Sequence, residues 1–304
     1  MDGIIALYKE RGLTSHDCVF KLRKILKTKK VGHTGTLDPE VAGVLPICVG
    51  RATKLAEYLT DEGKEYHAEI TLGRSTTTED QTGDTVAEKE ISEPISVQEI
   101  AKVLDELTGE ITQIPPMYSA VKVAGKKLYE YARAGESVER PKRQVQIDEL
   151  KRLDSHEITQ ASPSFALRIR CGKGTYIRTL AVMIGEKLGY PAHMSALRRS
   201  KSGFFEEADC LTLAEIEEKM QADDLSFLKP LELGVQSFPQ VMLTEALHKR
   251  VLNGALLTEQ ELFKEEIVPS SPVALLFDGK LTALYQKHPS RSGVWKPEKV
   301  IELA

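Results

Sequence analysis

The sequence lacks segments that carry a chain into or through a membrane. Its opening residues, MDGIIALYKERG, contain no cationic stretch followed by a long apolar run, so no secretion signal is predicted. No window elsewhere is apolar over enough residues to span a bilayer. We therefore expect a cytoplasmic protein without a membrane partner.

Cysteine is sparse, and its spacing argues against two kinds of site. The four cysteines, Cys18, Cys48, Cys171 and Cys210, lie far apart and form no CxxC pair. Such spacing is typical of reduced thiols in a cytosolic protein, and it disfavours both a disulfide framework and a zinc site. We expect four free thiols.

Common cofactor and catalytic motifs are also missing. The segment GRATK lacks the spacing of a Walker loop, and no GxGxxG follows a predicted strand. The seven histidines show no HExxH or paired metal-ligand spacing, and no nucleophile elbow supports a Ser-His-Asp site. What remains for chemistry is an aspartate in a glycine- and threonine-rich loop, a tyrosine on a strand, and the segment KGTYIRTL.

The net charge of −4 gives no overall attraction to a polyanion, but the cations are clustered. Acidic residues collect elsewhere, as in EIEEK and KEEIV, and this asymmetry predicts a nucleic-acid-binding face. A solvated surface is the commoner explanation for any single basic run, but three runs together make it weaker. The three regions contain Lys21, Arg23, Lys24, Lys27, Lys29 and Lys30; Lys122, Lys126, Lys127, Arg140, Lys142 and Arg143; and Arg198, Arg199 and Lys201.

The pattern of apolar residues predicts an α+β fold. Strands and helices alternate without a regular βαβ repeat, which disfavours a doubly wound sheet. Residues 64–73 alternate with period two, and this places Tyr66 on the buried face of a strand. Strands are also predicted at 3–9 and 165–172, helices at 15–27, 52–60, 97–109 with Gly109 as its C-terminal cap, and 174–189, and a loop at 74–85.

The chain has room for a second domain in its 304 residues. After about Gln236 the pattern changes to a short helix, TEALHKRVLNG, and two apolar strands around Asp278-Gly279, a strong hairpin signal. We therefore expect a β-rich domain over residues 238–304, after a larger domain over residues 1–237. Basic and aromatic residues interleave in an exposed excursion near 113–143.

One acidic side chain is confined by its loop. In VGHTGTLDPEVAGVLP, residues 31–46, Asp38 is followed by Pro39 and surrounded by small residues. Arg178 is predicted in the first turn of a helix, where the helix dipole favours anions over cations, so another role is indicated. A guanidinium can hold a carboxylate bidentately, and Asp38 is the natural partner. On the spacing of KGTYIRTL alone, the simpler explanation is that Arg178 lies on the surface and Tyr176 in the core, without a functional role for either residue.

Six segments closely resemble, in the same order, motifs of the TruB family of bacterial tRNA pseudouridine-55 synthases. The resemblance covers roughly residues 3 to 210 and is highly specific. The tail is similar, more weakly, to the small PUA-like RNA-binding domain usual at that place. The matching segments are KERGLTSHDCV, HTGTLDPEVAGVLPICVGRATK, KEYHAEITLG, IPPMYSAVKVAGKKLYEYAR, CGKGTYIRTL and GYPAHMSALRRSKSGFF.

The resemblance implies a fold and a reaction. The fold would be a mixed, largely antiparallel sheet with flanking helices, followed by the PUA-like domain. The reaction would convert uridine to pseudouridine in the T-loop of tRNA: the N1–C1′ bond breaks, the uracil turns, and C5 joins C1′. The base must leave its stack for this chemistry. Such an isomerisation needs no cofactor and no metal. A stand-alone monomer that binds the T-arm, without a guide RNA, is expected.

The resemblance also assigns roles to individual residues. Asp38 corresponds to the catalytic aspartate, Tyr66 to the tyrosine that stacks on the flipped uracil, and Arg178 to the arginine paired with the aspartate. A second acid close to Asp38 in the pocket would add repulsion against phosphates. The substrate-binding residues implied by the resemblance are His33, which helps to hold the opened T-loop, Tyr176 and Leu197, which line the pocket, and Lys9, Gly35 and Thr36.

Three positions depart from the family pattern. Glu10 stands where the family usually has a proline, Gly172 where it has a serine, and Met183 where it has an aspartate. Met183 is expected to lie outside the pocket. Because Asp38 and Arg178 are both present, these departures do not imply loss of activity.

Three other functions remain open. A non-catalytic RNA-binding or RNA-folding protein would use the same basic surface, but it would gain nothing from a confined acid near phosphates. A guide-RNA-dependent synthase of the dyskerin type shares the core motif and works with partner proteins. A phosphatase-like enzyme with an aspartyl nucleophile would need further acids for magnesium, and the sequence offers none nearby.

Overall fold

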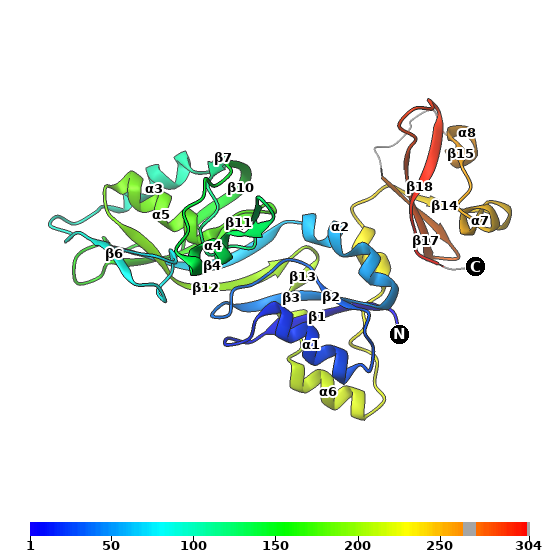
Figure 1. Cartoon of the computed structure of the whole chain (residues 1–304), viewed down its shortest axis with the longest axis horizontal. Helices are drawn as coiled ribbons and strands as arrows, with labels where there is room; N and C mark the ends of the chain where they lie inside the picture. Colours follow the sequence, from blue (N-terminus) through cyan, green and yellow to red (C-terminus); the bar gives the residue numbers. More distant parts are fainter. Residues whose placement is uncertain (264–271, 303–304) are drawn as a thin grey trace.

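A computed structural model describes residues 1–263 and 272–302 of the chain (Figure 1). Its first part is built around one large sheet, and its second around a smaller one. In chain order the first part contains β1 (Gly3–Lys9), α1 (Ser15–Ile25), β2 (Val31–His33), β3 (Ala42–Val49), the 3₁₀ helix η1 (Gly50–Leu55), α2 (Ala56–Asp61), β4 (Lys64–Leu72), β5 (Arg74–Thr76), β6 (Thr85–Glu88), α3 (Val97–Glu106), β7 (Gly109–Gln113), β8 (Lys122–Val123), β9 (Lys126–Lys127), α4 (Leu128–Ala134), β10 (Arg143–Arg152), β11 (Ser164–Cys171), α5 (Ile177–Leu188), β12 (Ala192–Ser202), β13 (Phe205–Glu206), η2 (Glu207–Asp209), α6 (Leu213–Gln221) and η3 (Leu231–Val235).

The large sheet is mixed and mainly antiparallel, as predicted. Its main path runs β1-β3-β12-β4-β11-β10-β7, with β2 added beside β3 and β13 beside β12. Only β3 and β12 pair in parallel, and they do so over a short stretch at Ala42 and Arg198. This parallel contact brings the loop before β3 next to the centre of the sheet. The α+β prediction is confirmed.

The helices cover the sheet in two groups (Figure 1). Helix α1 packs against α6 and β2 at the β1 end, while α5 lies on β12 and β4 and contacts α3. Helix α1 begins with a capping box in which Thr14 and Asp17 satisfy each other's backbone amides. Helix α5 ends at Gly189, which adopts the left-handed conformation that glycine allows. Buried aliphatic side chains from both groups join one continuous core.

Strand β4 has the predicted buried face. Tyr66, Ala68, Ile70 and Leu72 are all buried and alternate with more exposed residues. Lys64 lies on the same face and is only 7% exposed, which hydrophobic periodicity does not predict. The buried face of β4 therefore carries a cation as well as the tyrosine.

Three local predictions need correction. The helix predicted at 52–60 is divided into η1 and α2. Helix α3 ends at Glu106 with Leu107 as its C-terminal cap, and Gly109 opens β7 with a φ of +104° instead of capping the helix. The loop predicted at 74–85 is framed by the short hairpin of β5 and β6, because its ends pair with each other despite their polar sequence.

The excursion near 113–143 is bounded by paired strands. Gln113 at the end of β7 lies opposite Arg143 at the start of β10, so the chain leaves the sheet and returns at the same point. Between them lie the two-stranded β8–β9 ribbon and α4, which ends at Gly135 in the left-handed conformation. This excursion reaches back over the sheet towards α5.

The second part contains a five-stranded sheet in the order β14-β16-β17-β18-β15. Asp278 and Gly279 both have positive φ between β16 and β17, as a two-residue hairpin turn requires. One face packs around Tyr285 and Trp295, and the other shares a core with β1 and β3 of the first part. Its elements are β14 (Gln240–Met242), α7 (Glu245–Leu252), β15 (Leu257–Thr258), α8 (Glu259–Leu262), β16 (Val273–Phe277), β17 (Lys280–Lys287) and β18 (Val294–Val300).

Candidate active site

The loop of Asp38 connects β2 to β3 and is anchored on both sides of the aspartate. The backbone amide of Leu37 donates to the Ser15 hydroxyl at 2.8 Å, and that hydroxyl donates back to the Leu37 carbonyl at 3.2 Å. The Lys9 ammonium donates to the Pro39 carbonyl at 3.1 Å. These contacts fix the backbone that carries the carboxylate.

Lys9 does not line the pocket, so its predicted contact with substrate is not supported. Its ammonium is fully buried and also donates to the backbone carbonyls of Glu10 and Leu13. Burial lowers the pKa of this ammonium. Lys9 therefore ties the end of β1 to the loop that follows Asp38.

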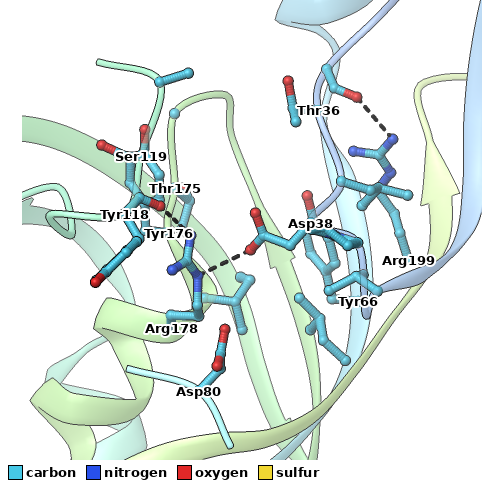
Figure 2. A pocket seen from close by; sticks show the side chains of 18 of the residues that line it. Thr36, Asp38, Tyr66, Asp80, Tyr118, Ser119, Thr175, Tyr176, Arg178 and Arg199 are labelled. Carbon is cyan, nitrogen blue, oxygen red and sulfur yellow. Dashed lines mark hydrogen bonds and ion pairs between the residues drawn. The ribbon is translucent and has the colours of Figure 1, made fainter. Parts of the chain in front are cut away.

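Arg178 pairs with Asp38, as the sequence predicted (Figure 2). The contact is a single one, from Nε to Oδ2 at 3.0 Å, and the expected bidentate geometry is wrong. The other arms of the guanidinium donate to the backbone carbonyls of Thr78 and Tyr118, each at 2.9 Å. One buried side chain thus joins the aspartate loop to the β5–β6 hairpin and to the excursion.

Asp80 is a second acid in this pocket, and the expectation of a lone carboxylate is wrong. It accepts hydrogen bonds from the Thr78 and Thr82 hydroxyls at 2.7 and 2.6 Å. Burial raises the pKa of Asp38, the Arg178 charge lowers it, and Asp80 raises it. No local pattern pointed to Asp80, because it lies in a polar loop without periodicity.

Two strands form the opposite wall of the pocket. Tyr66 on β4 is 8% exposed and lies opposite Arg199 of β12, and Leu197 lies on the same strand as Arg199. Figure 2 shows Tyr66 and Arg199 on the side of Asp38 that faces away from Arg178. Burial raises the pKa of the Tyr66 phenol, while the nearby Arg199 charge lowers it.

Arg199 corrects the prediction of a third basic surface. It is 1% exposed, and it donates through Nε to the Val44 carbonyl at 2.7 Å and through Nη2 to the Gly35 carbonyl at 3.3 Å. Its neighbours Arg198 and Lys201 form ion pairs with nearby glutamates. Of the three cations on this strand, only Arg199 is buried, while the side chains of Arg198 and Lys201 are 44% and 39% exposed.

The remaining predicted residues divide between the pocket and its surroundings. Gly35, Thr36 and Tyr176 line the pocket, whereas His33 does not. The His33 Nδ1 atom is buried and has no hydrogen-bond partner among the described residues. Burial lowers the pKa of His33, and this favours the neutral imidazole.

Gln113 is a supporting residue that the sequence did not reveal. It is 1% exposed and holds the backbone of Tyr176 at both polar atoms: its Oε1 accepts from the Tyr176 amide at 2.9 Å, and its Nε2 donates to the Tyr176 carbonyl at 3.2 Å. These bonds join the end of β7 to the start of α5. Only the tertiary fold brings together residues so far apart in the chain.

The three departures from the family pattern fall in different places. Gly172 lines the pocket, and Met183 lies outside it, as expected, where it packs against the core. Glu10 is exposed beside the turn that follows β1. None of the three forms a hydrogen bond or ion pair with Asp38 or Arg178 in the described part of the chain.

The pocket has a volume of about 610 Å³, within the range of small-ligand sites. Its lining comes from the Asp38 loop, β4, the β5–β6 hairpin, the excursion, the start of α5 and β12. Within residues 1–263 and 272–302, no group of three or more His, Cys, Asp or Glu side chains is arranged to hold a metal ion. All four cysteines are free, as expected. In the same described ranges, no helix has the length and hydropathy needed to cross a membrane.

Comparison with known families gives two adjoining matches. Residues 23–177 match the family model of the TruB family pseudouridylate synthase N-terminal domain. Residues 178–236 match that of the tRNA pseudouridylate synthase B C-terminal domain. The chain belongs to the TruB family. The resemblance seen in the sequence motifs is therefore confirmed.

Individual TruB relatives match along the whole chain. The protein named tRNA pseudouridine synthase B from Listeria innocua is 68% identical over 100% of this chain and 99% of its own length. The protein of the same name from Bacillus subtilis is 53% identical over 99% of this chain and 98% of its own. Among solved structures, a chain of a Cbf5-Nop10-Gar1 complex aligns with a TM-score of 0.76 and 29% identity, covering 99% of this chain and 85% of that one.

Proposed function

We propose that this pseudouridylate synthase acts on the uridine at position 55, in the T-loop of tRNA, as a stand-alone monomer in the cytoplasm. The observation that carries the proposal is the ion pair between the buried Arg178 and the partly exposed Asp38, in one pocket with Tyr66. The full-length similarity to proteins named tRNA pseudouridine synthase B supports tRNA as the substrate.

In the proposed mechanism the target uridine leaves its stack and enters the pocket. The Asp38 carboxylate then either attacks C1′ of the ribose or takes a proton from C2′ to give a glycal. In both routes the N1–C1′ bond breaks, the uracil turns, and C5 forms the new bond to C1′. The reaction is an isomerisation, so atoms and electrons balance without a cofactor or metal.

Arg178 and Tyr66 have distinct proposed roles. Arg178 holds the carboxylate ionised and oriented, and the backbone carbonyls of Thr78 and Tyr118 fix the guanidinium in turn. Tyr66 presents its ring to the uracil, and base–aromatic stacking contributes about 1–3 kcal/mol. Its hydroxyl can also help to remove the C5 proton.

Three regions of the chain are proposed to bind the tRNA. The cations around α1 are exposed, and none forms an ion pair with an acidic residue in the described part of the chain; these are Lys21, Arg23, Lys24, Lys27, Lys29 and Lys30. The excursion near 113–143 carries further cations beside Tyr129 and Tyr131. Residues 238–304 are proposed to act as a PUA-like RNA-binding domain. Cationic surfaces of this kind bind phosphates without sequence preference.

A guide-dependent function is the main alternative, because the structural relative comes from a Cbf5-Nop10-Gar1 complex. The test is to incubate the purified chain with an unmodified tRNA transcript and to map pseudouridine. We expect product at the T-loop uridine without guide RNA, added metal or nucleotide. Asp38→Asn is the matched control, and it should bind tRNA within a few-fold of wild type but form no product. Product only when guide RNA is added would overturn the proposal.

A further inference from the structure

Two buried cations lie on the pocket wall beside Tyr66, and the proposed mechanism leaves them without a chemical role. Lys64 precedes Tyr66 by two residues on β4 and shares its face, and Arg199 lies opposite Tyr66 on β12. Their exposed fractions are 7% and 1%, and both line the pocket. The tyrosine that is proposed to stack on the uracil is therefore flanked by two positive charges.

Both cations lack a carboxylate counter-ion. Among residues 1–263 and 272–302, no acidic side chain forms an ion pair with Lys64 or Arg199. The Lys64 ammonium instead donates to the backbone carbonyls of Thr60 and Glu62, the latter at 2.5 Å. Neutral carbonyls orient the ammonium, and the more distant charges of Asp61 and Glu62 only partly offset the lowering of its pKa.

The same two cations lie beneath the loop of Asp38. A Cβ atom at Gly35 would lie 3.6 Å from Arg199 Nη1 and 3.8 Å from Lys64 Cε. The loop thus passes within van der Waals contact of both side chains at Gly35, three residues before the carboxylate. The two charges therefore border the place where the reacting nucleotide must sit.

Burying a cation without a partner is costly, so such charges are retained where they meet a negative charge. Burial and the neighbouring Arg199 charge lower the pKa of Lys64 to about 8, so the ammonium stays charged at neutral pH. The proposed reaction supplies an anion at this place. When the N1–C1′ bond breaks, the electron pair stays on the uracil and is shared by N1, O2 and O4.

We propose that Lys64 and Arg199 stabilise the uracil anion released when the N1–C1′ bond breaks. This inference rests on the proposed function. The cations act through charge alone: the anion's C5 then bonds to C1′, the C5 proton leaves, and N1 gains a proton, which gives the isomer. Fixed charges aimed at a developing anion act strongly in a site from which water is excluded.

Lys64 is the better residue to test, because Arg199 also supports the Asp38 loop. Lys64→Met keeps the length of the side chain and removes the charge. We expect its single-turnover rate on a uridine tRNA to fall on the order of a hundredfold or more. Lys64→Arg should recover part of the rate, and binding of tRNA should change little. The control for net charge is Lys219→Met, which removes a cation on α6 that pairs with Asp224.

The decisive comparison uses tRNA with 5-fluorouridine at the target position. Fluorine stabilises the uracil anion, so the leaving group depends less on the protein, and the loss caused by Lys64→Met in N1–C1′ cleavage should become clearly smaller. Equal losses on the two substrates would overturn the proposal. A loss confined to tRNA affinity would also overturn it and would assign Lys64 to a phosphate. Product formation by wild type on the uridine tRNA tests the proposed function separately.

Discussion

At the residue scale, the pocket is organised by one side chain with three partners. Arg178 contacts Asp38 through Nε and uses its other two nitrogens for the carbonyls of Thr78 and Tyr118. The sequence suggested that the guanidinium of Arg178 binds the Asp38 carboxylate through two nitrogens. In the structure its three nitrogens instead contact three separate segments of the chain. The position of Asp38 relative to the pocket therefore depends on the shape of the guanidinium as well as on its charge.

Arg178→Lys tests this dependence on shape. The lysine keeps the positive charge, but a single ammonium cannot reach three acceptors in fixed directions. We expect a large loss of single-turnover rate with near-normal tRNA binding, measured by rapid quench and filter binding. A rate close to wild type would show that charge alone organises the site.

The acid side of the pH–rate profile reports on Asp38. Burial raises the pKa of its carboxyl above the ordinary 3.8, and Arg178 lowers it in part. Both proposed routes need the carboxylate, so the rate at low tRNA concentration should fall as pH decreases through this pKa. Arg178→Gln removes the lowering charge, so the limb should move to higher pH. If the acid side of the profile lies at the same pH in Arg178→Gln and wild type, a group other than Asp38 is responsible for it.

Tyr66 allows stacking and acid–base help to be separated. Tyr66→Phe keeps the ring and should bind tRNA normally, but it should turn over on the order of a hundredfold more slowly if the hydroxyl takes part in proton transfer. Tyr66→Leu should lose the stacking contribution as well. Single-turnover rates of the two variants give the comparison. If both variants match wild type, Tyr66 does not contact the uracil.

At the element scale, the start of α5 is positioned by the end of β7. Arg178 occupies the first turn of α5, and Gln113 of β7 holds the backbone of Tyr176, the residue before that helix. The two elements meet because β7 closes the path of the sheet beside β10. Strand β7 lines no part of the described pocket, yet through Gln113 it positions the start of α5.

Gln113→Ala should reveal this support. The substitution leaves the backbone amide of Tyr176 without its partner, whereas the Tyr176 carbonyl keeps the hydrogen bond from the Leu180 amide at 3.0 Å. An unsatisfied group of this kind typically costs about 1–3 kcal/mol. We expect a lower free energy of unfolding in urea and a slower single turnover, with tRNA affinity retained. Gln144→Ala on β10 removes an exposed amide as a control. A stable Gln113→Ala variant with normal rate would remove Gln113 from the site's framework.

The same scale shows which elements could be predicted. The hairpin at Asp278-Gly279, the N-terminal cap of α1 and the buried face of β4 all follow from short-range rules, and the structure contains each of them. The end of α3 was misplaced because Gly109 serves the next strand instead. Local sequence signals identify an element as a helix or a strand. They do not decide whether a glycine between two elements caps the first or begins the second.

At the scale of the whole molecule, the tail (residues 238–304) shares a hydrophobic core with the first part, whereas a domain held only by a linker would have a separate core. Ala274 and Leu284 share a core with Ile4, Val44 and Leu55. Strand β18 also lies against α2, where Lys299 pairs with Glu57. The tail therefore contributes to stability as well as to the proposed RNA affinity.

Deleting residues 238–304 should separate these contributions. We expect weaker tRNA binding and a lower melting temperature, since apolar side chains of β1 and β3 become exposed. The folded fraction should still form pseudouridine slowly at saturating tRNA, because the deletion leaves Asp38 and Arg178 in place. Circular dichroism gives the folded fraction. A folded but inert truncation at saturation would mean that the tail takes part in the chemistry.

The sequence by itself determined the family, the α+β class and the identity of Asp38, Tyr66 and Arg178 as candidates. Only the tertiary structure decided that Arg199 is buried, that Asp80 enters the pocket, and that Lys64 faces it. The physical reason is that the burial of a charge depends on which strands and loops pack around it. Such contacts join residues far apart in the chain, and no local pattern of hydrophobic or charged residues records them.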